Sequence, residues 1–334
     1  SNKAVSCAHL AAHRDISCIA EQTLIRAGEN GALGPPCDDH DLRYRPRHKP
    51  GGEGSAVNSP PVSSPSPTPT PMPTPPGTLL FEDEFSTGTL NRQMWNVEGP
   101  TFWVNNELQA YVDEAATISF ANPAGAEDGA LVLKPVSRPG FVTPTGRVTD
   151  FVSGRINTRD KFSVTYGRIA ARIRMPDAAG VWPAFWMLGY GQWPDAGEID
   201  IMEYVGVPSW TAVAMHGPGY SGDTPLVQRQ DFPAGTDVTD WHEYAVERTE
   251  DTVIFFVDDR EIYRVTRADV EQHGPWRFDR PEYLILNFAI GGNYPNAVNG
   301  ITAPYFGMPQ ETADRIALGE VAMEVDWVRV WSPS

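Results

Sequence analysis

A proline-rich run of eighteen residues divides the chain and limits what it can fold into. Sixteen of the eighteen residues at positions 59–76 are Pro, Ser or Thr. Such a segment cannot bury enough apolar surface to join a core, and its prolines favour an extended polyproline II conformation. We therefore expect three parts: an N-terminal segment of unknown role over residues 1–58, a Pro/Ser/Thr-rich linker over residues 59–77, and a folded domain over residues 78–334.

The two sides of this linker differ in composition. All ten tryptophans lie after it, whereas Cys7, Cys18 and Cys37 lie before it. The segment before it has no clear periodicity, and we expect it to be poorly ordered. Three cysteines permit one internal disulfide at most, and without a C-x-x-C pair they give little support for a metal site.

Composition and charge exclude several classes of protein. With 41% hydrophobic and 10% aromatic residues the chain can form a core. No run approaches the roughly 20 apolar residues of a membrane-spanning helix, so we expect no membrane span. Residues 1–58 are neutral, so the formal charge of −17 belongs to the rest of the chain. That charge repels phosphates and argues against a nucleic-acid partner.

The region after the linker has the pattern of an all-β protein. In residues 166–175, Ile169, Ala171 and Ile173 alternate with arginines, which is typical of a half-buried antiparallel strand. Residues 253–265 resemble two strands around an Asp258-Asp259 turn. Further strands are expected at residues 130–135, 242–248, 283–290 and 321–331, and no stretch sustains a long amphipathic helix. These elements predict a sandwich of two packed antiparallel sheets.

Three acidic residues fall within the decapeptide GEIDIMEYVG at residues 197–206. On a regular strand Glu198 and Asp200 share one face, and Glu203 joins them if a β-bulge at Ile201-Met202 adds one residue. Repulsion among three carboxyls on one face raises at least one pKa. The arrangement suits glycoside hydrolysis, which needs a carboxylate nucleophile and a carboxylic acid. A solvated acidic strip and a calcium site remain open as alternatives.

Tryptophans precede the acids directly. Trp182 and Trp186 surround Pro183, which favours a loop or a strand end over a helix interior. Indole faces stack on the C–H faces of pyranose rings, so tryptophans beside paired acids predict a sugar-binding cleft.

These motifs together resemble glycoside hydrolase family 16, in its laminarinase-like endo-β-1,3-glucanase form. The similarity covers residues 79–334 and is carried by GEIDIMEYVG together with FEDEF, NNELQAYV, SGRINT, WPAFWMLG, HGPGYSG, NFAIGGNYP and VDWVRVW. It implies a β-jelly-roll sandwich with a concave glycan-binding cleft. It also implies Glu198 as nucleophile, Glu203 as acid/base about 5–5.5 Å away, and Asp200 as the residue that positions the nucleophile.

The resemblance implies roles for further residues. Trp182 and Trp186 match a stacking platform, and Arg155 and Asn106 match groups that bind sugar hydroxyls. His216 either hydrogen-bonds near Asp200 or to the substrate, or is a structural histidine. Trp103 either caps the cleft or fills the core. Asp326 matches the side-chain ligand of a structural calcium ion, with backbone oxygens near Glu84 and Gly129.

The function expected from this resemblance is retaining endo-hydrolysis of laminarin-type β-1,3-glucan, extending to mixed-linkage β-1,3-1,4-glucan. The alternatives are a relative that cleaves another polysaccharide of the agarose or carrageenan type, and a non-catalytic β-glucan-binding protein. No cofactor is expected for catalysis. The linker, the cysteine-free domain and a polymeric substrate predict a secreted protein, which we expect to be a monomer.

Overall fold

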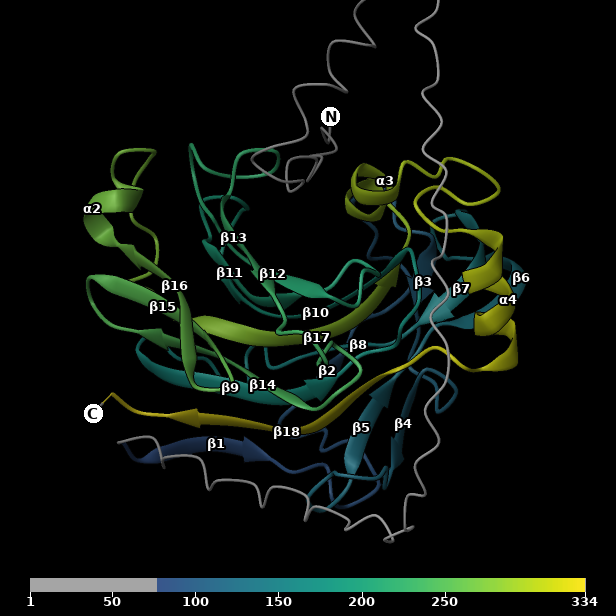
Figure 1. Cartoon of the computed structure of the whole chain (residues 1–334), viewed down its shortest axis with the longest axis horizontal. Helices are drawn as coiled ribbons and strands as arrows, with labels where there is room; N and C mark the ends of the chain where they lie inside the picture. Colours follow the sequence, from purple (N-terminus) through teal and green to yellow (C-terminus); the bar gives the residue numbers. More distant parts are fainter. Residues whose placement is uncertain (1–76, 334) are drawn as a thin grey trace, which may run out of the picture. The chain divides into compact units, whose positions relative to one another are not determined.

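The computed structural model describes residues 77–333. The N-terminal segment 1–58, its three cysteines and the linker up to residue 76 lie outside the described residues, so the expectations for them stay predictions. The regular elements of the described part are mostly β-strands, which form two large sheets and one small sheet (Figure 1). This confirms the expected all-β sandwich.

The first sheet has eight strands and is antiparallel throughout. Its order is β16-β15-β14-β9-β18-β5-β4, and β1 also pairs with β18. The strands are β1 (Leu79–Asp83), β4 (Ile118–Ala121), β5 (Ala130–Leu133), β9 (Gly167–Arg174), β14 (His242–Arg248), β15 (Thr252–Val257), β16 (Arg260–Thr266) and β18 (Met323–Trp331).

The second sheet has seven strands in the order β13-β12-β11-β10-β17-β8-β2. Its strands are β2 (Asn96–Val97), β8 (Arg155–Asn157), β10 (Val181–Gly189), β11 (Glu198–Glu203), β12 (Trp210–His216), β13 (Leu226–Asp231) and β17 (Glu282–Ile290). The strand with the three acids, β11, thus lies inside the sheet, between β10 and β12.

A small sheet and three short helices complete the described part. The small sheet has the order β3-β7-β6, from β3 (Gln109–Tyr111), β7 (Val148–Ser153) and β6 (Val136–Val142). The helices are α2 (Arg267–Val270), α3 (Asn293–Asn299) and α4 (Gln310–Leu318). None of the helices described here is long and apolar enough to cross a membrane.

The main core lies between the two large sheets, which Figure 1 shows as stacked layers. Alternate residues of each strand point into it, such as Ile169 and Ile173 of β9 and Ile199 of β11, which are all fully buried. A separate apolar cluster on the other side of the seven-stranded sheet includes Trp182 and Tyr294, the latter from α3. This face of the seven-stranded sheet, which points away from the main core, can therefore form a site beside that cluster.

Most of the expected strands are confirmed. The segment at residues 253–265 forms the hairpin β15–β16, and Asp258 and Asp259 have φ values of 50° and 60°, as a tight type I′ turn requires. The expectation for Pro183 is wrong, because it lies within β10 rather than in a loop or at a strand end. The carbonyl of Pro183 accepts from the amide of Tyr204, just beyond the end of β11. The amide and the carbonyl of one strand residue point to the same side, so the N–H that proline lacks would also face the end of β11, where its loss costs little.

The predicted bulge in β11 is confirmed by the strand register. Asp200 lies opposite Ala214 of β12 and Glu203 lies opposite Ala212, so three steps along β11 match two steps along β12. Ile201 and Met202 are both fully buried in the main core. The extra residue therefore returns Glu203 to the face that carries Glu198 and Asp200.

Candidate active site

The three acids lie together in a cleft on the exposed face of the seven-stranded sheet. This cleft has a volume of about 570 Å³ and is lined by Glu198, Asp200 and Glu203 along its floor. Its other lining residues are predominantly aromatic or amide-bearing, and they include Phe102, Trp103, Asn105, Asn106, Trp182, Trp186, Trp193 and Asn287. The sequence predicted this grouping for the acids, and the bulge in β11 produces it.

Glu198 has two polar neighbours besides the other acids. The indole Nε1 of Trp193 donates a hydrogen bond of 3.1 Å to its Oε2. The Nε2 atom of His216, directly opposite on β12, lies 3.7 Å from its Oε1. One face of the carboxyl is therefore fixed in orientation, while its side chain keeps 16% exposure toward the cleft.

Glu203 is held by a different indole. Trp182 of β10 donates from Nε1 to Oε1 of Glu203 at 3.0 Å. The two glutamates thus each have their own tryptophan donor. Because an indole N–H can only donate, each contact fixes the carboxyl without removing its ability to exchange a proton with a substrate.

Asp200 lies between the two glutamates and next to His216. The Nε2 of His216 is 3.2 Å from Oδ2 of Asp200, and both side chains are almost completely buried. The structure therefore places His216 next to Asp200 and within 3.7 Å of Glu198, and its role stays a prediction.

Burial and mutual repulsion raise the pKa values of all three carboxyls. Burial is the main cause for Glu198 and Glu203, and the charge of Asp200 adds to it, so the pKa of each glutamate rises to about 8. His216 and the two indole hydrogen bonds act in the opposite direction. The pKa of Asp200 also lies well above its usual range, through burial and the charge of Glu282. The set therefore titrates as a unit and keeps at least one proton near neutral pH.

The predicted sugar-binding residues form one wall of the cleft. The guanidinium of Arg155 lies 4.9 Å from the ring of Trp186 and 4.2 Å from the ring of Phe102. Trp186 also donates to Asn287 at 2.7 Å. Asn106 lies at the rim, where its side-chain amide donates to Asn293 of α3 at 2.8 Å. Flat faces and fixed polar groups alternate along this wall, as sugar recognition requires.

Trp103 lies at the rim rather than in the core. It is 46% exposed, and its Nε1 donates to the backbone oxygen of Glu107 at 2.7 Å. Of the two alternatives considered for this residue, core packing is therefore excluded by its exposure.

The carboxylate of Asp326, the expected side-chain ligand of calcium, already binds nitrogen donors and as arranged does not fit the ion. Both carboxylate oxygens of Asp326 accept from nitrogen donors, namely the guanidinium of Arg172 and the amide of Glu127. The Nε and Nη2 atoms of Arg329 each donate to a carboxylate oxygen of Glu84 at 2.7 Å. Gly129 packs against the backbone of Phe85. A calcium ion needs six to eight oxygen ligands, and a guanidinium repels it.

One other group could offer metal ligands. Among the described residues, Glu198, Asp200 and His216 place one ligand atom each within 4.8 Å of one another. These residues already belong to the candidate active site, so a metal there would compete with their contacts to one another.

Sequence reasoning missed two residues of the site. Trp193, the donor to Glu198, lies in the turn before β11, where no strand alternation indicates the direction of a side chain. Glu107 is buried in the cleft wall and accepts from Gln109 at 2.7 Å. Burial raises the pKa of Glu107, and the charge of Arg155 partly offsets this. The NNELQAYV motif contained Glu107, but only Asn106 was selected from it.

A jelly-roll sandwich with carboxyls on the floor of an aromatic cleft defines a class of carbohydrate-active protein. The chain belongs to the glycosyl hydrolases family 16, whose pattern it matches over residues 102–307. It is 34% identical over 280 residues to glucan endo-1,3-beta-glucosidase A1 of Niallia circulans, a match that covers 76% of this chain and 37% of that protein. It therefore spans well under half the length of that relative.

Two further comparisons agree with this assignment. The beta-glucanase of Rhodothermus marinus is 37% identical over 227 residues, covering 64% of this chain and 76% of that protein. The solved catalytic domain of the Thermotoga maritima laminarinase superposes with a TM-score of 0.64 at 31% identity, covering 77% of this chain and 99% of that structure.

Proposed function

We propose that this protein is a retaining endo-β-1,3-glucanase that hydrolyses laminarin-type glucans and accepts mixed-linkage β-1,3-1,4-glucan as a related substrate. The observation that carries the proposal is the pair of glutamates on the bulged strand β11, each held by its own indole at the floor of an aromatic cleft. The named relatives, which include two glucanases and a laminarinase, support the choice of glucan.

The proposed reaction proceeds in two displacements. A carboxylate oxygen of Glu198 attacks the anomeric carbon and forms an ester bond as the glycosidic C–O bond breaks. Glu203 gives its proton to the departing oxygen, which a pKa raised by burial allows. Water then attacks the same carbon, its proton passes to Glu203, and Glu198 leaves as carboxylate. The anomeric configuration is retained.

Asp200 and His216 serve as positioning residues in this scheme. Charge moves off Glu198 when the ester forms, and the repulsion from Asp200 is then relieved, which favours that step. His216 contacts both acids and limits how far that repulsion separates them. Arg155, Trp186 and Asn106 would align the sugar rings across the cleft. Proton transfer and ester exchange complete the reaction, so we propose that it needs no cofactor.

The charge of the cleft favours a neutral polymer over a sulfated one. Four carboxyl residues line it, namely Glu107, Glu198, Asp200 and Glu203, against one arginine, Arg155. A sulfated galactan of the carrageenan type would meet net repulsion there. Agarose is uncharged and is not excluded by this argument.

Reducing-sugar release from laminarin, lichenan and agarose, with Glu198→Gln as the control, tests the proposal. We expect release from laminarin that disappears in the variant, and NMR of the first products should show the β-anomer. Release from agarose alone would make agarose the substrate and leave the proposed mechanism unchanged. Binding of laminarin without release from any polymer would identify a glucan-binding protein instead. Activity that survives complete chelation would agree with cofactor-free hydrolysis, whereas its loss would point to a metal.

Secretion and a monomeric state complete the proposal. The proline-rich linker and the absence of cysteine after it support a secreted protein that acts on a polymer outside the cell. Immunodetection in culture medium and light scattering of the purified chain test these two points.

A further inference from the structure

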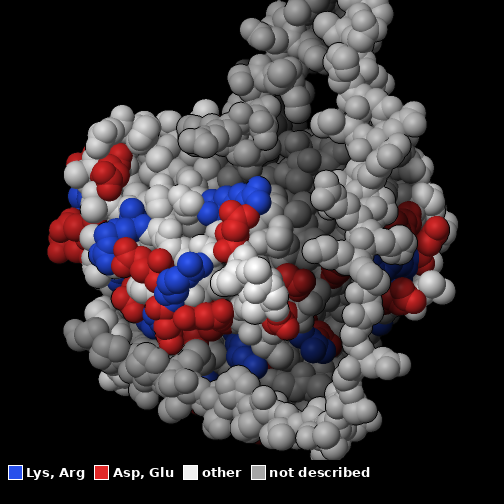
Figure 2. Space-filling view, in the orientation of Figure 1, with Lys and Arg blue, Asp and Glu red and all other residues white. Residues whose placement is uncertain are grey.

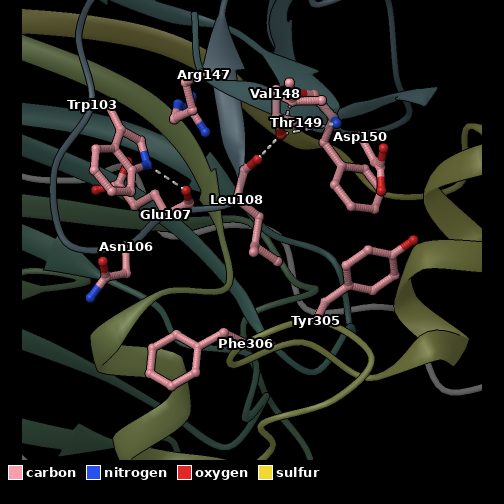
Figure 3. A pocket seen from close by; sticks show the side chains of 11 residues that line it. Trp103, Asn106, Glu107, Leu108, Arg147, Val148, Thr149, Asp150, Tyr305 and Phe306 are labelled. Atoms are coloured by element: carbon pink, nitrogen blue, oxygen red, sulfur yellow. Dashed lines mark hydrogen bonds between the residues drawn. The ribbon is translucent and has the colours of Figure 1, made fainter. Parts of the chain in front are cut away.

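A second cavity lies next to the cleft. It has a volume of about 580 Å³, and it shares Trp103, Asn106 and Glu107 with the cleft. Its remaining walls come from the start of β7 and from Tyr305 and Phe306 in the loop after α3 (Figure 3). None of the three acids of β11 lines it, so it is separate from the chemistry yet continuous with the cleft.

Aromatic and aliphatic side chains with exposed faces surround this cavity. In Figure 3, Trp103 lies at the upper left, Tyr305 at the right and Phe306 below, with Leu108 near the middle. Trp103 is 46% exposed and Val148 is 64% exposed, which makes them two of the large hydrophobic residues that the described surface leaves open. Apolar surface gathered at a concavity marks a binding site more often than a solvated one.

Polar groups at the cavity are held in place by the backbone. The guanidinium of Arg147 lies 5.2 Å from the ring of Trp103 and donates to the backbone oxygen of Gln109 at 2.6 Å. Asp150 accepts from the amide of Gly140 at 3.0 Å. Each side chain keeps further atoms that can bind a ligand. Arg147 faces two acids at the wall, Asp150 and Glu107, and burial raises the pKa of Glu107. With no excess of positive charge, the cavity suits an uncharged, hydroxyl-rich ligand with an apolar face.

We propose that this cavity binds a hexopyranose unit of the glucan, as a second contact outside the catalytic cleft. The inference rests on the proposed function, because a polymer that occupies the cleft brings further sugar rings to the shared wall of Trp103 and Asn106. The ring could belong to a side branch or to the continuing main chain, which have the same chemistry. A second contact on one polymer raises its apparent affinity without altering the reacting groups.

Val148→Glu tests the proposal with little risk to folding, because it adds a charge to an exposed side chain at the cavity rim. Leu80→Glu on β1 is the matched control, since Leu80 is 48% exposed and lines neither cavity. We expect Val148→Glu to raise KM for laminarin about three- to tenfold, because a charged carboxylate at the rim keeps the sugar ring from stacking on the aromatic wall, and to raise it less for laminaritetraose. Leu80→Glu should match the unmodified protein on both substrates.

Three substrates separate the sources of the ring. A rise in KM confined to β-1,6-branched laminarin identifies a branch sugar, and an equal rise with a long linear β-1,3-glucan identifies the main chain. Equal KM values for Val148→Glu and Leu80→Glu on every polymer would overturn the inference.

Binding provides a readout that does not depend on hydrolysis. In the Glu198→Gln background, calorimetry with laminaribiose, which is too short to occupy the cleft and the cavity together, should give two classes of site, and the added Val148→Glu should remove one. If the unmodified protein hydrolyses no β-1,3-glucan but the second class of site is present, the proposed function fails and the cavity assignment stands. A single class of site in Glu198→Gln would overturn the cavity assignment alone.

Discussion

Acidic residues on the two large sheets have different kinds of partner. On the outward face of the eight-stranded sheet, each arginine of a short series is matched to acids: Arg168 binds Glu243, Glu247 and Asp259, and Arg172 binds Asp326. On the cleft face of the seven-stranded sheet, Glu198, Asp200 and Glu203 contact only indoles and one histidine. Figure 2 shows acidic and basic side chains intermixed over much of the described surface in view.

This difference separates acids that stabilise the fold from acids that can react. A guanidinium holds its carboxylate in place and opposes the effect of burial on the pKa, as Arg168 does for Glu243, whose pKa burial raises. A buried carboxyl without such a partner holds its proton up to a higher pH and can exchange it with a substrate. The following predictions test whether that division is real.

The largest expected effect is the loss of activity in Glu203→Gln. An amide cannot donate a proton to the leaving oxygen, so kcat for laminarin should fall about 10²- to 10⁴-fold. Glu324→Gln, which removes an acid bound by Arg174 on the eight-stranded sheet, is the control and should leave kcat unchanged.

Azide separates the two glutamates by the product they give. It should restore turnover to Glu203→Ala and yield the β-glycosyl azide, because Glu198 still forms the ester. With Glu198→Ala the product should be the α-glycosyl azide. The same anomer from both variants would show that the roles are not divided between the two residues.

The second prediction concerns stability alone. Arg168→Met leaves the buried Glu243 without its cationic partner, and the free energy of unfolding should fall by about 3 kcal/mol, with kcat of the folded protein unchanged. Urea denaturation measures the first quantity and initial rates measure the second. Combining Arg168→Met with Glu243→Leu should recover part of the loss, since no charge is then left buried. A drop in kcat would contradict the separation between the two sheets.

The third prediction is a substitution that raises the free energy of unfolding, whereas the second lowers it. The folded-state pKa of Glu203 is about 8, above the ordinary value of 4.5. As pH rises through this interval, the unfolded chain loses the proton while the folded protein keeps it, so the free energy of unfolding falls. Glutamine has no such cost, and Glu203→Gln should therefore be more stable than the unmodified protein at pH 8, by about 1–2 kcal/mol.

The same comparison at pH 4.5 should show little difference, because both states then hold the proton. Glu84→Gln, which releases Arg329, should be less stable at both pH values. Thermal denaturation of the three proteins at each pH measures this. A destabilised Glu203→Gln at pH 8 would mean that its carboxyl is paired as firmly as those on the eight-stranded sheet.

The sequence predicted the acids better than their surroundings because strand alternation is local. Two apolar residues, Ile201 and Met202, separate the second acid from the third, so all three acids share one face only if the strand has a bulge there. The register confirms this bulge. Trp193 reaches Glu198 from a turn, and turns have no period from which a side-chain direction can be read. Pro183 lies inside a strand, against the local expectation for proline. Where the neighbouring strand β11 ends decides whether an N–H is needed at this position, and that is a tertiary feature.

The calcium expectation also depended on contacts between distant parts of the chain, which a local motif does not reveal. VDWVRVW placed Asp326 correctly on β18, but its partner Arg172 is contributed by β9, far away in the sequence. A pairing between distant strands decides whether that carboxylate is free for a cation. The residues of a site are therefore more predictable than the charges that face them.

The smallest expected effect lies in a histidine at the start of β14 in the eight-stranded sheet. His242 contacts Asp258 at 2.6 Å through Nδ1 and the backbone oxygen of Asp237 at 2.9 Å through Nε2. Burial lowers the pKa of His242, but the hydrogen bond and charge of Asp258 outweigh it, with Asp240 adding to them, and the net shift is upward from 6.5. The stabilisation is therefore complete below pH 6.5 and is lost as pH rises through the folded-state value.

Asp258→Asn should accordingly lower the free energy of unfolding by about 1 kcal/mol at pH 5.5, a modest amount because the Asp258 side chain is 52% exposed. The difference should shrink at pH 8.5, where the histidine is neutral. This pH dependence is opposite in kind to that of Glu203→Gln, whose advantage grows with pH. A loss that is the same at both pH values would mean that the contact holds the hairpin β15–β16 by geometry rather than by charge. The contrast between paired and unpaired groups would then not extend to this part of the fold.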